Sequence, residues 1–371
     1  MTKEPSHLHP GEPPAEKAAS GTPASTALSS GRIRDVAGNR RRRTLARVLV
    51  LLLVVGTAYL IAVPMVAWTK VRKVDAEPAG SRPADQPGTT YLLVGSDSRE
   101  GLTKRQRTRL HTGNAEGGRA DTIMLLHTGD GPNLLMSIPR GSLVPVPGHG
   151  TAMINAAYEY GGPELLVETV EDATGIRVDN YVEIGFRGVV TLADTVGGIT
   201  ICPKVAMDDD RANLHVRPGC QHADGRKALA YARSRHAQRL DDVDRAEHQR
   251  EVVSATGSQA VSLGTFLNPA RYWKVMVAGA ESITVGANVG PVAFAKLTLA
   301  MRHIDGSTGL ACGLPIADFA VSAVHWDQER AGRMFALIRE DRTGEIDESL
   351  CQPSGLPPSG AGERVAGTPS T

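Results

Sequence analysis

The chain has 371 residues, of which 41% are hydrophobic and 22% are charged. These fractions are close to those of ordinary globular proteins, and they exclude both a wholly disordered chain and a protein with many membrane spans. The formal net charge is +1, but nine basic and four acidic residues among the first 47 give that segment +5 and leave −4 for the remainder. A nucleic-acid-binding domain is expected to be basic, so nucleic acid is not an expected partner.

One long segment without charges divides the chain. Val48 to Trp68 comprises 21 uncharged residues, which as a helix would be about 30 Å long, the thickness of the hydrocarbon core of a bilayer. A buried helix of a soluble protein is one alternative. A cleaved signal peptide is another, but the apolar run is too long for it and no A-x-A site follows. The segment predicts an uncleaved transmembrane helix over residues 48–68.

The charges on either side of this segment predict its orientation. Arg40 to Arg43 and Arg47 precede it, whereas the basic residues just beyond it are diluted by Asp75 and Glu77. Cytoplasmic flanks carry the excess of Lys and Arg. We therefore expect a single-pass protein of the cell membrane, with the N-terminus cytoplasmic and the C-terminal domain extracytoplasmic.

Composition divides the rest of the chain into four regions. Residues 1–47 are rich in small residues and proline and predict a disordered basic cytoplasmic tail. Residues 69–88 predict a Pro/Gly-rich linker, and residues 343–371 predict a flexible C-terminal tail. The expected extracytoplasmic domain comprises residues 89–342.

Within that domain, apolar strands alternate with amphipathic helices. We expect strands at 89–95, 120–129, 133–140, 181–186, 198–203 and around 310–320. We expect helices at 163–173, from 187 through 194, and at 226–231, 246–263, 291–301 and 327–339. Strands interleaved with helices predict an α/β sandwich with an apolar central sheet, but the pattern does not fix the order of the strands.

Four cysteines fall in the part expected outside the membrane, without the spacing of a metal site. An even number in an oxidising compartment predicts two disulfides. Three pairings are possible. We favour Cys202–Cys220, which would close one polar loop, together with Cys312–Cys351, which would attach the tail.

Arginines and aspartates gather where the predicted strands end. Motifs of serine hydrolases, zinc proteases, Walker-type ATPases and dinucleotide-binding proteins are missing from the sequence. What remains is a set of charged and polar residues in the segments GSDSR, GRADT, SIPRG and ARSRHAQRLDDVDRAEHQR: Asp97, Arg99, Arg119, Asp121, Arg140, Arg233, Arg235, Asp242, Arg245 and Gln249.

Such a set suits a diphosphate and a divalent cation. Guanidinium groups are planar forks that match phosphate oxygens, and several in one place repel one another unless a highly charged anion lies among them. Carboxylates beside them would hold Mg²⁺, which favours oxygen ligands and keeps water and phosphate as the others. The pattern indicates phosphoryl transfer. A structural network of ion pairs is the alternative interpretation.

In order and spacing, several stretches over about residues 89–263 are similar to the LytR-CpsA-Psr family of cell-wall assembly proteins. They are YLLVGSDSR, RADTIMLL, LLMSIPR, MINAAYEYGGPELLVETVEDATGIRVDNYVEIGF, LADTVGGITICP and GRKALAYARSRHAQRLDDVDR. The resemblance implies a three-layer α/β/α sandwich with a central mixed sheet, preceded by one transmembrane helix. It also implies a Mg-dependent phosphotransferase that moves a glycopolymer from a polyprenyl-diphosphate lipid carrier onto peptidoglycan.

The same resemblance assigns roles to the residues that match it. Arg119, Arg140, Arg233, Arg235 and Arg245 would grip the diphosphate. Asp97, Asp121 and Asp242 would hold or orient Mg²⁺, and Arg99 and Gln249 would support the site. A general base for the acceptor hydroxyl is expected among the carboxylates.

Two positions depart from the family's pattern. Gly141 stands where an aspartate is common, and His248-Gln249-Arg250 stands where Arg-Gln-Gln is common. His248 could replace a cation only when protonated, which would introduce a pH dependence. These departures favour one alternative to the enzyme, a non-catalytic binding module for lipid-linked wall glycan. The basic amino-terminal tail suggests another, a membrane-anchored transcriptional attenuator.

Overall fold

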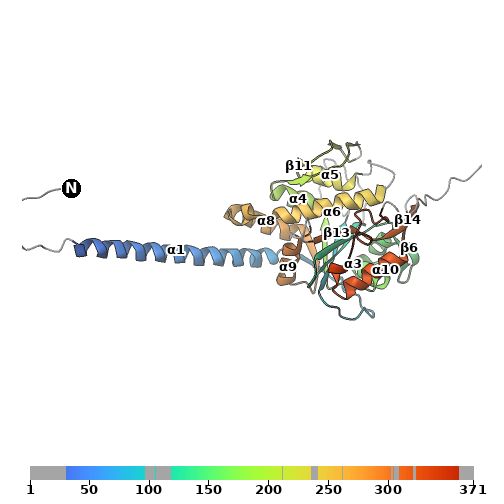
Figure 1. The fold of residues 1–371 in the computed structure, drawn as a ribbon, viewed down its shortest axis with the longest axis horizontal. Coiled ribbons are helices and arrows are strands. Elements are labelled where there is room, and N and C mark those ends of the chain that lie inside the picture. Colours follow the sequence, from blue (N-terminus) through green and yellow to red (C-terminus); the bar gives the residue numbers. More distant parts are fainter. Residues whose placement is uncertain are drawn as a thin grey trace, which may run out of the picture. The chain divides into compact units, whose positions relative to one another are not determined.

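The computed structural model describes residues 31–96, 105, 118–210, 212–234, 241–260, 262–301, 304, 309–320 and 323–358. The chain forms two units, Met1–Ala58 and Tyr59–Thr371. The first unit contains most of the long helix α1 (Gly31–Trp68), and the second contains its last turns and the remainder of the chain. Figure 1 shows the elements of the second unit as strands flanked by helices.

Helix α1 exposes apolar side chains along most of its length. Leu49, Leu53 and Ile61 are 66%, 70% and 58% exposed. An apolar surface of this extent is expected to face lipid rather than water. The part Arg40–Trp68 is long and apolar enough to cross a membrane, so α1 fits a single-pass anchor. The helix begins at Gly31, so residues 31–47 are helical rather than part of a disordered tail.

A seven-stranded mixed sheet forms the centre of the second unit. Its strands, in spatial order, are β1 (Arg72–Val74), β12 (Ile283–Gly286), β7 (Asn180–Gly185), β2 (Thr89–Ser96), β3 (Ala120–Thr128), β4 (Asn133–Ile138) and β13 (Gly309–Gly313). β2 pairs in parallel with β7 and antiparallel with β3, while β4 pairs antiparallel with β3 and in parallel with β13. The central strands are buried on both faces, which explains why they read as continuous apolar runs.

Helices cover both faces of this sheet. On one face, α3 (Ile154–Thr174) and α10 (Gln328–Arg339) pack over the side chains of Leu92, Ile123 and Met136. On the other face, α6 (Asp241–Ala260) and α9 (Pro291–Met301) pack over Tyr91 and Leu135. These layers confirm the three-layer α/β/α sandwich with a central mixed sheet.

A second cluster of elements extends this core beside α6. Helices α4 (Phe186–Thr195), α5 (Gly225–Arg233) and α8 (Pro269–Ser282) share a small apolar core with the pair β8 (Ile199–Ile201) and β11 (Gln221–Ala223) and with the pair β9 (Met207–Asp209) and β10 (Leu214–Val216). The short helix α7 (Leu263–Phe266) joins α6 to α8. The strand expected at 198–203 therefore exists as β8, but it lies outside the central sheet because it pairs with β11.

Two further hairpins complete the described part of the fold. β5 (Leu143–Val146) pairs with β6 (Gly150–Met153), and β14 (Ile316–Ala320) pairs with β15 (Ala323–Trp326). The late strand expected around 310–320 is thus two strands, since β13 joins the central sheet and β14 leaves it.

Helix α3 contains a kink just before residue 163, where the sequence analysis expected a helix to begin. Gly161 and Gly162 have non-helical backbone angles, and Gly162 has a φ of 66°, which favours glycine. Pro163 then opens the straight part, because a proline is tolerated in the first turn of a helix. The expected helix at 163–173 is this second part, and residues 154–160 form an additional helical segment.

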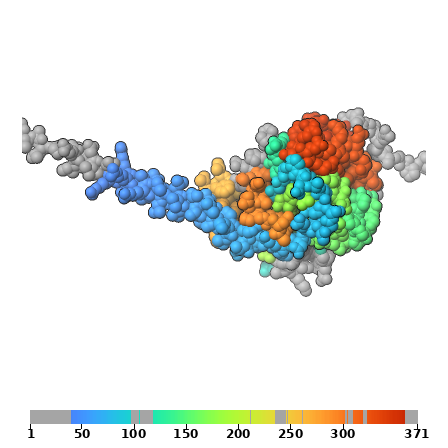
Figure 2. Space-filling model, turned by 90° about the horizontal axis from the view of Figure 1, so that it is seen from below, coloured from blue at the N-terminus to red at the C-terminus, as the bar shows by residue number. Residues whose placement is uncertain are grey.

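The segments expected to be a linker and a tail are packed against the domain. β1 adds to the edge of the sheet through β12, and Arg82 donates to the buried carboxylate of Glu171 at 2.6 Å. At the other end of the domain sequence, Ile346 and Leu350 are buried beyond the 3-10 helix η1 (Thr343–Glu345). Figure 2 shows the red C-terminal part of the domain lying next to its blue and green parts. The folded domain therefore begins before residue 89 and extends past residue 343.

Both favoured disulfides are confirmed. Cys202 pairs with Cys220 and closes the segment between β8 and β11. Cys312, at the end of β13, pairs with Cys351 and fastens the C-terminal segment to the central sheet.

Candidate functional site

Several strand ends meet at one edge of the central sheet. Ser96, the last residue of β2, lies opposite Ala120, the first residue of β3, and opposite Gly185, the last residue of β7. β4 ends at the same edge, since Ile138 pairs with Ile123. The last residues of β2, β4 and β7 and the first residues of β3 are therefore brought together although they are far apart in the sequence.

Asp121 and Arg140 form the central ion pair of this edge. Arg140 Nη1 donates to Asp121 Oδ1 at 2.7 Å, and the two side chains are 24% and 22% exposed for the aspartate and the arginine respectively. The antiparallel pairing of β3 and β4 brings them together two residues beyond the Ile123–Ile138 pair. This pair keeps a guanidinium and a carboxylate side by side and within reach of solvent, which a site for a charged ligand requires.

Arg119 lies next to this pair in sequence but points to a different partner. Its Nε donates to Glu159 Oε2 at 3.0 Å and its Nη2 to Glu159 Oε1 at 3.4 Å, so it forms a two-pronged ion pair with α3. Both side chains are about half exposed. The pair would have to open, at least in part, for Arg119 to bind a phosphate.

Arg233 reaches the same edge from the end of α5. Its guanidinium carbon lies 4.8 Å from the centre of the Phe186 ring, and Phe186 directly follows the last residue of β7. A cation over an aromatic face is held in place without consuming its hydrogen-bond donors. Helix α5 itself begins where Asp224 accepts from the backbone N–H of Lys227, a capping interaction that fixes the start of the helix.

Helix α6 brings two of the expected site residues into the interior. Arg245 and Gln249 are 4% and 7% exposed, and their spacing of four residues places them on one face of the helix. Asp242 also belongs to α6, but its side chain lies outside the described residues, as do Asp97, Arg99 and Arg235 entirely. The structure thus places six of the expected residues: Arg119, Asp121, Arg140, Arg233, Arg245 and Gln249.

Arg250 is a buried arginine to which sequence analysis gave no role. Its Nη1 donates to Ser137 Oγ and its Nη2 to the carbonyl of Pro353, both at 2.9 Å. Burial lowers the pKa of its guanidinium to about 10, so it remains charged at neutral pH. These bonds hold α6 against β4 and against the C-terminal segment. They thereby fix the position of α6 relative to the end of β4, which Arg140 follows. The sequence marked this position only as part of the His248-Gln249-Arg250 segment, which departs from the family's pattern.

The structure excludes His248 as a replacement cation at neutral pH. Burial is the main cause that lowers the pKa of this imidazole to about 4, and Lys204 lowers it further while Glu247 opposes the shift. The ring lies 4.3 Å from that of Tyr231, and Nδ1 is buried without a hydrogen-bond partner among the described residues. His248 is therefore a neutral packing residue.

Gly141 has a structural role in its backbone. Its carbonyl accepts from the N–H of Val324, and the following Ser142 forms a bridge to the same residue of β15. The β14–β15 hairpin is thus attached directly behind Arg140. Where an aspartate is common in the family, this chain supplies a backbone contact and no carboxylate.

Glu183 is a polar residue of β7 that the sequence pattern did not single out. Its two carboxylate oxygens accept from the hydroxyls of Tyr158 at 2.9 Å and Tyr181 at 2.8 Å. Burial, followed by the charge of Glu183, raises the pKa of Tyr181 well above its usual value. The alternation in YVEIGF was the available signal, since it puts Glu183 on the same face as Tyr181.

The donor set at the sheet edge fits Mg²⁺ in chemistry. Asp121 is a partly exposed carboxylate that pairs with Arg140 through Oδ1, and carboxylate oxygen is the protein ligand that Mg²⁺ prefers. A different group of metal-ligand type, Asp208, Asp210 and His215, lies around the exposed β9–β10 hairpin. That group is separate from the sheet edge, and its three side chains are exposed.

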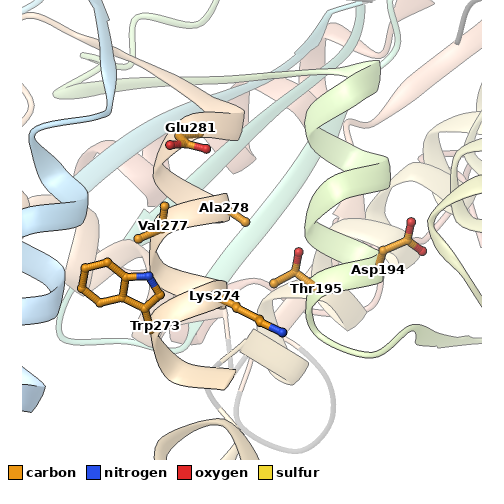
Figure 3. Close-up of a pocket in the computed structure, with 7 residues that line it drawn as sticks. All are labelled: Asp194, Thr195, Trp273, Lys274, Val277, Ala278 and Glu281. Carbon is orange, nitrogen blue, oxygen red and sulfur yellow. The ribbon is translucent and has the colours of Figure 1, made fainter. Parts of the chain in front are cut away.

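An open pocket of about 510 Å³ lies elsewhere, between α4 and α8 (Figure 3). None of the residues that line it belongs to the expected site: they are Asp194, Thr195, Trp273, Lys274, Val277, Ala278 and Glu281. The pocket is therefore separate from the candidate site at the sheet edge.

The chain combines a helix that fits a transmembrane anchor with an α/β/α domain that carries arginine and aspartate side chains at one sheet edge. These features are those expected of the membrane-anchored cell-wall assembly proteins to which the sequence is similar. The model of the LytR_cpsA_psr family matches residues 61–297 of the chain. This match covers more than half of the sequence, and the chain belongs to that family.

Individual relatives and solved structures agree with this membership. The chain is 45% identical over 294 residues to "Probable cell wall biosynthesis protein LcpB" of Corynebacterium glutamicum, a match that covers 77% of this chain and 69% of the relative. It is 27% identical to "Polyisoprenyl-teichoic acid--peptidoglycan teichoic acid transferase TagT" of Bacillus subtilis, over 70% of this chain and 75% of the relative. The fold is similar to that of the "LytR-Csp2A-Psr enzyme from Actinomyces oris", with a TM-score of 0.59 at 22% identity, covering 73% and 96% of the two chains.

Proposed function

We propose that this protein is a membrane-anchored phosphotransferase that moves a glycopolymer from a polyprenyl-diphosphate lipid carrier onto peptidoglycan. The observation that carries the proposal is the Asp121–Arg140 pair, at 2.7 Å and partly open to solvent, at the edge where the strands of a family-typical sheet end. The name of the B. subtilis relative supports the same class of reaction.

In the proposed site, arginines bind the diphosphate. Arg140 and Arg233 approach the sheet edge from β4 and α5, and Arg119, Arg235 and Arg245 would complete the set. Arg99 and Gln249 would position these side chains. Because guanidinium forks match phosphate oxygens and remain charged, they neutralise the donor's charge and orient its phosphorus atoms.

Carboxylates would hold the divalent cation. Asp121, with Asp97 and Asp242, would supply the oxygen ligands. When bound, Mg²⁺ would offset negative charge on the diphosphate oxygens. Asp121 would hold the cation beside Arg140, whose guanidinium pairs with it at 2.7 Å and would bind phosphate.

The reaction replaces the phosphoanhydride bond of the donor with a phosphodiester bond to the acceptor. An acceptor hydroxyl of peptidoglycan attacks the phosphorus attached to the glycopolymer, and the bridging P–O bond to the lipid-side phosphate breaks. Polyprenyl phosphate leaves, and the hydroxyl proton passes to a carboxylate acting as general base. Cleavage of the diphosphate bond drives the transfer, so no nucleotide is needed outside the cell.

The proposal also assigns the sidedness of the anchor. With the arginine-rich flank in the cytoplasm, the domain lies on the outer side, where peptidoglycan is found. The lipid carrier and the enzyme would then share one membrane.

The test uses the full chain in lipid nanodiscs with Mg²⁺, a prenyl-diphosphate-linked glycan as donor and peptidoglycan fragments as acceptor, and measures prenyl phosphate release by mass spectrometry. Arg140→Ala and Asp121→Asn are each expected to lower kcat/KM by about 100-fold or more, since each removes a group that stabilises developing charge. Arg342→Ala is the matched control, because it removes an exposed arginine–carboxylate pair away from the sheet edge.

The binding-module alternative makes a different prediction for the same assay. Donor binding without release of prenyl phosphate in the wild type would contradict the transferase and support a module. Equal rates for Arg140→Ala and Arg342→Ala would contradict the placement of the site.

A further inference from the structure

The helical pair α7–α8 carries an exposed apolar surface beside the end of the anchor. Leu263 and Leu267 are 71% and 80% exposed, and Phe266 and Trp273 are also exposed. No charged residue occurs from Val252 through Ala270. Exposed apolar side chains clustered in this way mark a surface that another apolar phase covers.

Hydrogen bonds fix the height of this surface relative to the last turns of α1. Tyr59 Oη donates to the carbonyl of Pro269 at 2.8 Å, and Tyr272 Oη donates to the carbonyl of Leu60 at 2.9 Å. The amino-terminal end of α8 therefore lies beside Tyr59 and Leu60.

A second contact gives the direction in which α8 runs. Lys70 Nζ lies 3.1 Å from Glu281 Oε1, near the carboxyl end of α8. From Tyr59 to Lys70 is eleven residues and from Pro269 to Glu281 is twelve, so the two helices run side by side in the same direction with matching rise. The rise of 1.5 Å per residue places Pro269 about 16 Å from Lys70 along the axis of α1, on the side of the uncharged segment.

This geometry determines what surrounds α7. Tyr59 lies inside the uncharged segment that ends at Trp68, and α7 precedes Pro269 by only three residues. An element beside Tyr59 is at or below the level of the interfacial Trp68, whose ring packs on Phe294 of α9. Water cannot be the main neighbour of Leu263 and Leu267 at that level.

We propose that α7 and the first turns of α8 are a second membrane-contacting element, which inserts into the outer boundary between headgroups and acyl chains. Leu263, Phe266 and Leu267 enter the acyl region, while Trp273, one turn further along α8 toward Lys70, lies closer to the headgroups. Lys274 then meets the phosphates of anionic lipids. Figure 3 shows Trp273 and Lys274 projecting to different sides near the same end of α8.

The domain would then contact the bilayer through two elements, α1 and the α7–α8 segment. A single helix leaves a domain free to turn about the helix axis, whereas a second insertion fixes which face meets the membrane. The inference depends on α1 as the anchor and not on the reaction, so a failure of the proposed function would leave it standing.

The test is a spin label on the full chain in nanodiscs of phosphatidylcholine and phosphatidylglycerol. The four native cysteines are paired in disulfides, so Leu267→Cys provides one free thiol for the label. Thr151→Cys on β6 is the matched control, since Thr151 is exposed in the domain and β6 lies away from α8 in Figure 1. We expect the label at 267 to collide with oxygen several-fold more than with a water-soluble nickel chelate, and the label at 151 to show the reverse.

Two outcomes would overturn the proposal. Equal access of the nickel chelate to both labels would place α7 in water. A label at 267 reached by neither reagent would show that protein, such as a second copy of the chain, covers the surface. If Leu267→Cys does not fold, the fluorescence of the wild type and of Trp273→Phe in brominated lipid provides the second measurement, and a bromine-quenched component that persists unchanged in Trp273→Phe would contradict the insertion.

Discussion

His248 is the residue whose chemistry changes most between sequence and structure. Its place in a motif where the family commonly has arginine suggested a switchable cation. Burial beside Tyr231 makes the charged form unfavourable and lowers its pKa to about 4. At neutral pH the ring is therefore neutral, and it does not supply the positive charge of the arginine that is common at this position.

The same shift predicts a pH dependence of stability. The unfolded histidine titrates near 6.5 and the folded one near 4, so the unfolded chain binds the proton first as the pH falls. The contribution of His248 is fully present above pH 6.5 and is lost between pH 6.5 and 4, by about 3 kcal/mol. Urea denaturation of the full chain in detergent micelles should show this loss in the wild type and a flatter profile in His248→Gln. Parallel profiles for the two proteins would contradict the buried, neutral imidazole.

The arginines illustrate how one residue type serves several purposes at the residue scale. Arg140 pairs with Asp121 at the sheet edge, Arg119 binds Glu159 of α3, and Arg250 holds α6 to β4. A sequence lists them as equivalent positive charges. Their partners, which come from distant segments, decide which are available to a ligand.

At the scale of elements, the C-terminal segment is part of the domain because of specific attachments. Arg330 donates to the carbonyls of Ser349 and Gly355, Leu350 is fully buried, and Cys351 is bonded to Cys312 of β13. Its Pro, Gly and Ser content resembles that of a flexible tail. Composition describes what a segment could bury by itself, and here the docking surface is supplied by β13 and α10.

Loss of the Cys312–Cys351 bond should release that segment. The bond closes a loop of 39 residues, and its removal in a Cys312→Ser, Cys351→Ser variant is expected to lower the free energy of unfolding by about 2–4 kcal/mol. Hydrogen exchange over residues 343–356 should become faster in the same variant. The matched control is Cys202→Ser with Cys220→Ser, which removes a bond over a separation of 18 residues and should leave exchange over 343–356 unchanged.

At the scale of the whole molecule, the arrangement of the anchor predicts a topology that cells can report. The free thiol of a Thr151→Cys variant should react with a membrane-impermeant maleimide in intact cells that produce the full chain. The free thiol of a Ser20→Cys variant, on the amino-terminal side of the arginines that precede the anchor, should react only after the membrane is permeabilised. The reverse pattern would contradict the assigned orientation and, with it, access of the site to peptidoglycan.

Much of this molecule was determined by the sequence alone, because the signals concerned are local. The uncharged run of α1, the doubly buried strands β2, β3 and β4, and helices such as α10 depend on the length and periodicity of apolar residues within one segment. The two disulfides and the family membership were also predicted correctly from positions in the chain.

Tertiary structure decided what depends on neighbours distant in the sequence. The helical segment before the kink of α3, the pairing of β8 outside the central sheet, and the docking of residues 69–88 and 343–356 all require partners that no local pattern reveals. The pKa of His248, the partner of Arg119 and the height of α7 beside Tyr59 belong to the same class. Burial and charge pairing are properties of a position in space, and the chain acquires them only when its segments pack together.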